Sequence, residues 1–455
     1  MRWHTAQFGN SEEIAEQARI NEQIERFWKQ FAADSEQLRK NFFEDETEET
    51  VAWCEAYLKP IHEDLMWEVS RDILELGDKR LVFTVTPESE YALRPLTKAV
   101  VEKAPEIANW RFTQFKEPLI GDFDNFEHSM LKHSWSEVQG QINESPLKCF
   151  DITLSAKHFK KDNKDSDIAE ALTVLTTVLG EEPVDVWINF VQTEPQTKKK
   201  ALTKTAKKAT GKNKTAALEL IKDPQPAKST ESAKGAEAPK NAEITAQNST
   251  ENDTEAGGEA NTKIEPQPFY PLNLLRNILA TRVAELVDEL PIERCWERNL
   301  EGFYSLKGSS WEEGLRPVIT TPYPATIFAK ERRMLFHSSA FTRHDEVFAY
   351  LKMSQDQDLA HDVEARFELE DKLDKELRET GAGCVLGGGV GSEAAYIDMI
   401  ISNLPEAAEI LREQARKFEL PETSWLLFYD TYWVDEWVGM YKRTPPPEAH
   451  EGPMW

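Results

Sequence analysis

The sequence predicts an α+β protein with two domains, each an antiparallel sheet with helices packed on one face, joined by a disordered linker. Apolar residues at helical spacing alternate with short β-branched or aromatic runs on both sides of a long segment that lacks aromatic residues. The chain has 455 residues, 40% of them apolar, enough for two cores. We expect domains at residues 1–195 and 267–442, a linker at residues 196–266 and a flexible tail at residues 443–455.

The first domain is expected to open with a long amphipathic helix, because Ile20, Ile24, Phe27 and Phe31 recur at helical spacing. A second helix is predicted to stop before Pro60. Further helices are predicted at residues 93–104 and 168–179. Strands are predicted at residues 63–70 and 80–87, which form a hairpin, and at residues 110–115, 147–156 and 184–191.

The second domain is expected to begin with a helix over residues 275–290. Strands are predicted at residues 316–323, 326–330 and 332–341, then a helix carrying Leu369, Leu373 and Leu377 that Gly381 caps. A helix at residues 404–418 and a strand at residues 425–430 follow. Residues 51–115 and 363–429 thus share the order helix, hairpin, helix, strand, which suggests a duplication.

Composition excludes several classes of protein. The net charge of −27 argues against a chain that coats nucleic acid or an anionic membrane. We find neither a secretory signal nor an apolar run long enough to span a membrane. The four cysteines lie far apart, which favours neither a zinc ribbon nor a disulfide scaffold: Cys54, Cys149, Cys295 and Cys384. We therefore predict a cytoplasmic protein without a membrane partner.

One basic stretch is the exception to the acidic composition. Between Lys198 and Lys214, eight of 17 residues are lysine and none is acidic. Such a stretch can contact phosphates by releasing counterions, or it can be a linker that its own charge keeps extended. The linker interpretation is favoured, because the stretch has no aromatic residue to stack on bases and no arginine to read guanine.

A run of glycines, Gly387, Gly388, Gly389 and Gly391, lies between two apolar segments. Gly389, Gly391 and Ala394 match a weak form of the dinucleotide-binding fingerprint, which requires a helix directly afterwards. The residues that follow instead alternate as in a strand, and no Gly-Lys-Ser/Thr ending is present. The sequence therefore predicts a glycine hairpin and no cofactor, with a nucleotide site at Gly387, Gly389 and Gly391 as the alternative. A strand directly after Ser392 would exclude the dinucleotide interpretation.

Other candidate sites are weaker. An acidic stretch could bind a metal, but its ligand spacing fits no known motif and we predict none: Asp122, Asp124, Glu127, His128 and His133. His337 is interpreted as a satisfied core or edge histidine, and Ser338 and Ser339 lack the setting of a nucleophile elbow. Acidic and aromatic residues near the end of the chain are interpreted as a protein-binding patch: Asp430, Tyr432, Trp433, Asp435, Glu436 and Trp437. No catalytic set emerges.

Residues 65–118 resemble a bacterial family of unknown function. The matching residues are packing positions: Leu93, Arg94, Pro95, Leu96, Ala104, Pro105 and Trp110. In element order only, the segment resembles the ferredoxin-like regulator of ribonuclease activity B type. The resemblance implies a bacterial, cytoplasmic α+β protein and transfers no catalytic residue.

The function expected from these features is macromolecule binding or regulation without catalysis, with another protein as the partner. Nucleic acid is a partner only through the basic stretch from Lys198 to Lys214. The alternative is an enzyme. It would be nucleotide-dependent around Gly387–Gly391, or would use the carboxylates Asp430, Asp435 and Glu436.

Overall fold

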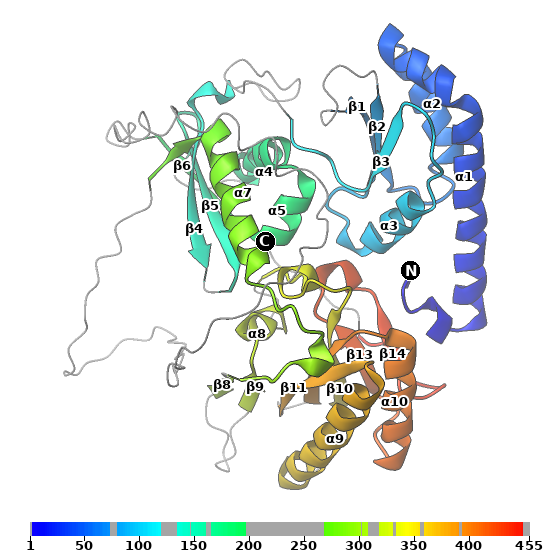
Figure 1. Ribbon diagram of the computed structural model, residues 1–455, viewed down its shortest axis with the longest axis vertical. Helices are drawn as coiled ribbons and strands as arrows, with labels where there is room; N and C mark the ends of the chain where they lie inside the picture. Colours follow the sequence, from blue (N-terminus) through cyan, green and yellow to red (C-terminus); the bar gives the residue numbers. More distant parts are fainter. Residues whose placement is uncertain are drawn as a thin grey trace, which may run out of the picture.

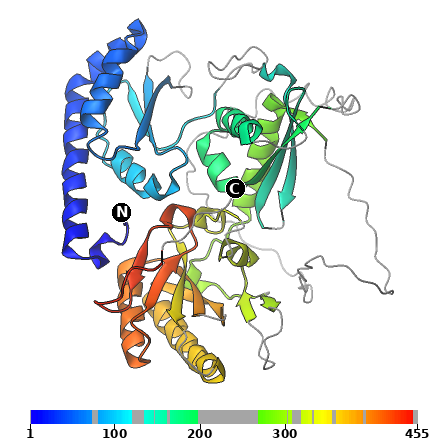
Figure 2. The same ribbon diagram turned by 180° about the vertical axis from the view of Figure 1, so that it is seen from behind.

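The computed structural model describes residues 2–72, 80–119, 134–145, 147–160, 165–196, 268–301, 303–307, 318–330, 334–354, 359–390 and 394–448. The predicted linker lies outside these ranges, except for Gln196. The described residues form three sheets, of three, four and seven strands. Figures 1 and 2 show them as three adjacent groups of elements. We call these the N-terminal unit (residues 2–119), the middle unit (134–196 with 268–288) and the C-terminal unit (289–448).

The N-terminal unit contains every element predicted for it: α1 (Ser11–Glu44), α2 (Thr47–Tyr57), β1 (Met66–Arg71), β2 (Leu81–Thr86), α3 (Arg94–Glu102) and β3 (Trp110–Thr113). Strand β1 is antiparallel to β2, and β3 is parallel to it, so this sheet is mixed and not antiparallel as predicted; the same holds for the sheet of the middle unit. Phe27 and Phe31 of α1 are buried against Phe83 of the sheet. The long helix α1 therefore supplies much of the core of this unit, as its apolar spacing predicts.

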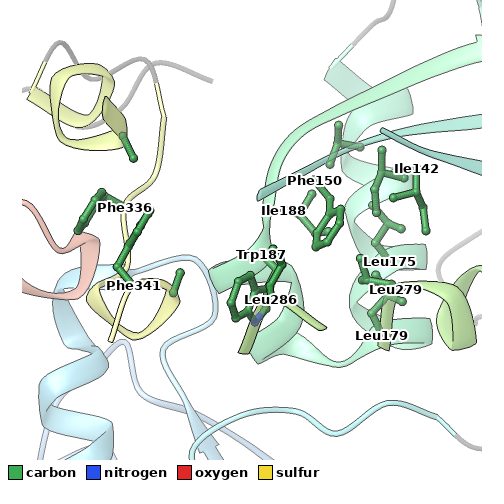
Figure 3. Close-up of a cluster of buried hydrophobic side chains, with 14 of the residues drawn as sticks. Ile142, Phe150, Leu175, Leu179, Trp187, Ile188, Leu279, Leu286, Phe336 and Phe341 are labelled. Atoms are coloured by element: carbon green, nitrogen blue, oxygen red, sulfur yellow. The ribbon is translucent and has the colours of Figure 1, made fainter. Parts of the chain in front are cut away.

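The middle unit comprises β4 (Gln139–Ser145), β5 (Cys149–Ala156), α4 (Asp165–Leu179), α5 (Glu181–Trp187), β6 (Ile188–Pro195), β7 (Tyr270–Pro271) and α7 (Leu272–Asp288). Strand β7 pairs with β4, so residues after the predicted linker complete this sheet. Figure 3 shows Leu279 of α7 close to Leu175 of α4 in the core. A Cβ on Gly140 would lie 2.6 Å from Leu275, which explains the glycine in β4. The expected assignment of α7 to the C-terminal domain is thus not what the structure has.

The predicted strand over residues 184–191 is only half right. Its first part is the helix α5, and strand β6 begins at Ile188. The alternation of Val184 and Val186 resembles a strand, but Glu181 and Asp185 share one face of a helical turn and both bind the same arginine. A long-range ion pair therefore overrides the local strand pattern.

The C-terminal unit comprises β8 (Tyr304–Lys307), β9 (Val318–Thr321), α8 (Pro324–Lys330), β10 (Val347–Ser354), α9 (Leu359–Thr380), β11 (Gly383–Val390), β12 (Ala394–Ile401), α10 (Leu404–Lys417), β13 (Ser424–Phe428) and β14 (Trp437–Gly439). Its strands form one antiparallel sheet in the order β14-β13-β10-β12-β11-β9-β8. Gly381 caps α9 with φ of 70°, as expected, and the Asn403 side chain caps α10.

Two predicted strands of this unit are wrong, and three of its strands, β8, β10 and β14, were not predicted. Residues 326–330 lie in α8, which Pro324 begins, because proline is favourable in the first turn of a helix. The described part of residues 332–341 contains the 3-10 turn Ser338–Ala340 and no strand. The central strand β10 was not predicted. Residues 443–448 of the predicted tail are described, and Trp425 Nε1 donates to the Pro445 carbonyl at 2.7 Å.

The seven-stranded sheet is buried on both faces, not on one as predicted. Helices α9 and α10 cover one face through Leu373 and Leu411. The opposite face carries Phe348 and Ile400 and packs against Phe336. Because both faces are covered, β12 reads as a nearly continuous apolar run.

The order hairpin, helix, strand occurs three times. It comprises β1-β2-α3-β3, β4-β5-α4-β6 with the short α5 inserted, and β11-β12-α10-β13. In the first two units the last strand pairs in parallel with the second strand of the hairpin. In the C-terminal unit β10 lies between β12 and β13 and is antiparallel to both. In the C-terminal unit the extra strand β10 therefore separates the last strand of this order, β13, from the hairpin.

Candidate functional site

A cleft of about 330 Å³ lies where the three units meet. The N-terminal unit contributes the start of α3, the middle unit contributes α5, and the C-terminal unit contributes the segments around Ser338, Val347 and Asp430. The segment before α1 adds His4. A cavity of this size between structural units is typical of a ligand site.

Arg94 forms the polar centre of this junction. Its guanidinium lies 2.8 Å from Glu181 and 2.6 Å from Asp185, and all three side chains are buried. Glu181 also accepts from the Thr86 hydroxyl at 2.7 Å and from the Lys116 amide at 2.8 Å. These contacts fix α5 of the middle unit against the N-terminal unit, next to the cleft.

The C-terminal unit reaches the same centre through Tyr432. Its hydroxyl donates to Asp185 at 3.3 Å. The guanidinium of Arg94 stacks over the rings of Phe115 and Tyr432, with 4.5 Å and 5.8 Å between the guanidinium carbon and each ring centroid. The aromatic residues of the cleft are therefore held by contacts from all three units.

One wall of the cleft is a stack of two rings. The imidazole of His4 lies parallel to the indole of Trp433 with centroids 3.9 Å apart. Burial lowers the pKa of His4 to about 4, and the nearby Lys98 ammonium acts in the same direction. His4 is therefore neutral at physiological pH and contributes a flat, uncharged surface.

Carboxylates outnumber cations around the cleft. Glu182 and Asp345 line it with no ion-pair partner among the residues that the structure describes, whereas Lys98 lies 3.7 Å from Glu102. Glu182 is exposed as a residue, but partial desolvation of its carboxylate raises its pKa, and Arg94 opposes this effect. Burial also raises the pKa of Asp185 to about 7 despite the neighbouring Arg94. A cation in the cleft would stabilise these carboxylates in their ionised form.

His337 lies behind the cleft and is fully buried. Burial lowers its pKa to about 4, although Asp430, whose Oδ1 lies 3.9 Å from Nδ1, acts in the opposite direction. His337 is buried in the core, as expected; its ring nitrogens make no hydrogen bond of regular geometry to described residues, and the backbone of Asp185 acts to raise its pKa. Its ring packs edge-on against Tyr432 with centroids 4.4 Å apart.

The predicted patch near the end of the chain is divided between two environments. Asp430, Tyr432 and Trp433 line the cleft, and Asp430 accepts the amides of Ser338 and Tyr432. Glu436 is buried against residues 2–5. Trp437 contacts the same segment, and Asp435 is exposed. Asp430 and Glu436 both receive backbone N–H groups, so their carboxylates have structural partners.

The two strands of the predicted hairpin are present, but Gly387, Gly388 and Gly389 lie within the first strand, β11, and not in a turn as expected. Strand β12 begins at Ala394 and pairs antiparallel with β11, where a helix would be required for dinucleotide binding. Gly391 lies outside the described residues. Gly387 has φ of 133°, and a Cβ there would lie 2.3 Å from the Thr320 carbonyl oxygen. The glycine at position 387 therefore permits close approach of β9 at a bulge in β11.

Other expectations concern metals and membranes. No group of histidine, cysteine or acidic side chains suited to a metal occurs in the part of the chain that the structure describes. The predicted acidic stretch from Asp122 to His133 lies outside that part, as do the lysines of residues 198–214. Among described residues, no helix has the length and apolar character needed to cross a membrane.

No family model, curated protein or solved structure matches this chain.

Sequence reasoning missed the residues that the other two units bring to the cleft. Arg94 was interpreted as a packing position, and Glu181, Glu182 and Asp185 were assigned no role. The sequence gives no local signal for the two ion pairs, because Glu181 and Asp185 lie 87 and 91 positions from Arg94 along the chain. An arginine at the start of an apolar helix was the available hint.

Proposed function

We propose that the protein is a non-enzymatic binding protein and that its cleft captures a positively charged segment of another protein. The observation that carries the proposal is the excess of carboxylates beside aromatic rings in one cleft at the junction of three units. Glu182 and Asp345 would bind a guanidinium or ammonium group. Tyr432 and Trp433 would contact its apolar stem or face, because cations are attracted to aromatic faces.

The electrostatics of the cleft support the same ligand class. Desolvation raises the pKa of Glu182, and a bound cation would favour its ionised form. Because Glu182 and Asp345 are exposed, each such contact would be modest in strength and screened by salt. The net charge of −27 adds long-range attraction for basic partners, which raises the rate of encounter at low salt.

A calorimetric titration tests the proposal. The probe is a short blocked peptide with two arginines, and the comparison is the same peptide with both arginines replaced by citrulline. We expect binding of the arginine peptide that weakens with added salt. The double variant Glu182→Gln and Asp345→Asn should weaken it at least tenfold, about 1.4 kcal/mol.

The matched control is Glu379→Gln, an exposed carboxylate on α9 that pairs loosely with Lys375. It should leave the affinity within twofold. Equal binding of the arginine and citrulline peptides, or an unchanged affinity in the double variant, would contradict the proposal.

The cellular setting and family relationship are proposed on separate grounds. Free, buried cysteines at all four positions support a reducing compartment such as the cytoplasm. The repeated order of hairpin, helix and strand supports a ferredoxin-like relationship. The likeness to a bacterial family of unknown function rests on residues 65–118.

A further inference from the structure

A second recognition site lies beside the cleft, where residues 2–5 surround one carboxylate. Glu436 accepts the amides of Trp3 at 2.5 Å, His4 at 2.8 Å and Thr5 at 2.8 Å. It also accepts the Thr5 hydroxyl at 2.6 Å. Successive amides that converge on one anion form a backbone nest, an arrangement that binds anions without a side-chain cation.

Two tryptophans hold the side chains of the same segment. The guanidinium of Arg2 lies 3.8 Å from the ring centroid of Trp437 and donates to the Trp437 carbonyl at 2.8 Å. The His4 ring stacks on Trp433. We call Trp433, Glu436 and Trp437 the tryptophan site. This site contacts the backbone amides, the Arg2 guanidinium and the His4 ring of one short segment. Peptide-recognition sites combine contacts to the main chain and to side chains in this way.

The helix that follows the segment has its own cap. The side chain of Asn10 caps α1 by accepting the amides of Glu12 and Glu13, and Glu13 accepts from the Asn10 amide. The segment contacts this helix through side chains, because Arg2 donates to both carboxylate oxygens of Glu13 and Gln17 donates to the Trp3 carbonyl. The other side-chain hydrogen bonds of residues 2–5 to described residues go to the tryptophan site. Displacing the segment therefore also breaks the bonds of Arg2 and Gln17 to or from α1.

We propose that the tryptophan site recognises a short segment of a partner protein in which an arginine precedes two flat side chains and a threonine. Residues 2–5 are the resident occupant of this site and show the geometry that the partner segment would adopt. The partner displaces them and moves His4 away from the cleft wall. This inference does not depend on which ligand the cleft binds.

The energetics set what a partner must overcome. A tethered occupant acts at an effective concentration in the millimolar range, so a free peptide competes poorly while the occupant is intact. A substitution that weakens the binding of residues 2–5 without altering the tryptophan site should make that site accessible to a peptide. Thr5→Pro does this, because it removes both the amide and the hydroxyl that bond to Glu436.

The test measures fluorescence anisotropy of a labelled peptide with the sequence of residues 1–9, added to the full chain. We expect it to bind the Thr5→Pro chain at least tenfold more tightly than the unaltered chain. Glu436→Gln in the Thr5→Pro chain should lower the affinity at least tenfold, and so should Arg2→Gln in the peptide. Glu379→Gln, an exposed carboxylate outside both the cleft and the tryptophan site, should change it less than twofold.

Two results would overturn the inference. One is equal peptide affinity of the Thr5→Pro and unaltered chains; the other is an affinity that Glu436→Gln does not change. If circular dichroism shows that Thr5→Pro unfolds the chain, amide exchange decides with the unaltered protein. Excess peptide should then accelerate exchange of the amides of Trp3, His4 and Thr5, and unchanged exchange would reject the inference.

Discussion

Two buried acidic centres join the units of this protein, and they compensate charge in different ways. At the first, the guanidinium of Arg94 lies between Glu181 and Asp185. At the second, Glu436 receives four hydrogen bonds from residues 3–5. The first centre opposes one positive charge to two negative ones. The second neutralises a single charge with backbone dipoles and one hydroxyl.

This difference teaches how each junction should fail. Removing the cation at the first centre leaves two carboxylates buried with no opposite charge, which is costly. Removing one donor at the second centre leaves three others in place, so the loss is limited to about one hydrogen bond. The first centre should therefore be rigid, and the second should be able to open. The following predictions run from the largest expected effect to the smallest.

The largest effect is expected for Arg94→Met. The variant buries Glu181 and Asp185 without a cation, so the free energy of unfolding should fall by about 3–5 kcal/mol. Chemical denaturation measures this loss. Arg19→Met removes an exposed pair with Glu16 and should cost less than about 1 kcal/mol. Comparable losses in the two variants would mean that the Arg94 centre does not hold the units together.

An intermediate effect is expected for the pH dependence of His337→Phe. The folded-state pKa of His337, about 4, lies below its unfolded value of 6.5. Its neutral form is thus favoured by folding, and this contribution is lost as pH falls from 6.5 towards 4. The variant should gain stability relative to the unaltered protein over that range, by roughly 3 kcal/mol at its lower end.

The His337→Phe variant must be compared with the unaltered protein at each pH, because Asp185 changes the pH dependence of stability in the opposite direction. Its folded-state pKa is raised to about 7, so its contribution is present at low pH and is lost as pH rises. Asp185 is present in both proteins, so the difference between them reports mainly on His337. A difference in stability that stays constant from pH 7 to pH 4 would show that His337 does not titrate as its burial implies.

The smallest effect is expected for Thr5→Val at the second centre. The variant loses the hydroxyl bond to Glu436 and keeps the Thr5 amide bond, so unfolding should become easier by about 1 kcal/mol. Thr281→Val, on an exposed face of α7, is the control and should change stability by less than half as much. A loss at Thr5 as large as that of Arg94→Met would remove the distinction between the two centres.

The elements that sequence predicts well are those with a long apolar period. Helix α1 is an example, because Phe27 and Phe31 face a core within the same unit. Predictions failed where partners lie far away in the chain. Helix α5 reads as a strand in sequence although Arg94 fixes Glu181 and Asp185 on one helical turn. Helix α7 was expected in the C-terminal domain, but it packs beside β4 on the other side of the predicted linker.

The candidate site was predicted only from one side. Asp430, Tyr432 and Trp433 stand out in the sequence because acidic and aromatic residues gather within a few positions, and they do line the cleft. Arg94 and Glu182 complete the site from other units, and no local pattern marks them. The backbone donors that bind Glu436 also lie more than 430 positions away along the chain, and no sequence periodicity predicts such a contact.

The most direct test of the central claim is amide hydrogen exchange with and without the two-arginine peptide. The account predicts slower exchange at parts of the chain that line the cleft in all three units: residues 94–98, 182–186, 338–347 and 430–433. The citrulline peptide should leave these residues unchanged. Protection confined to other parts of the chain, or no protection at all, would contradict a cation-binding cleft at the junction of the three units.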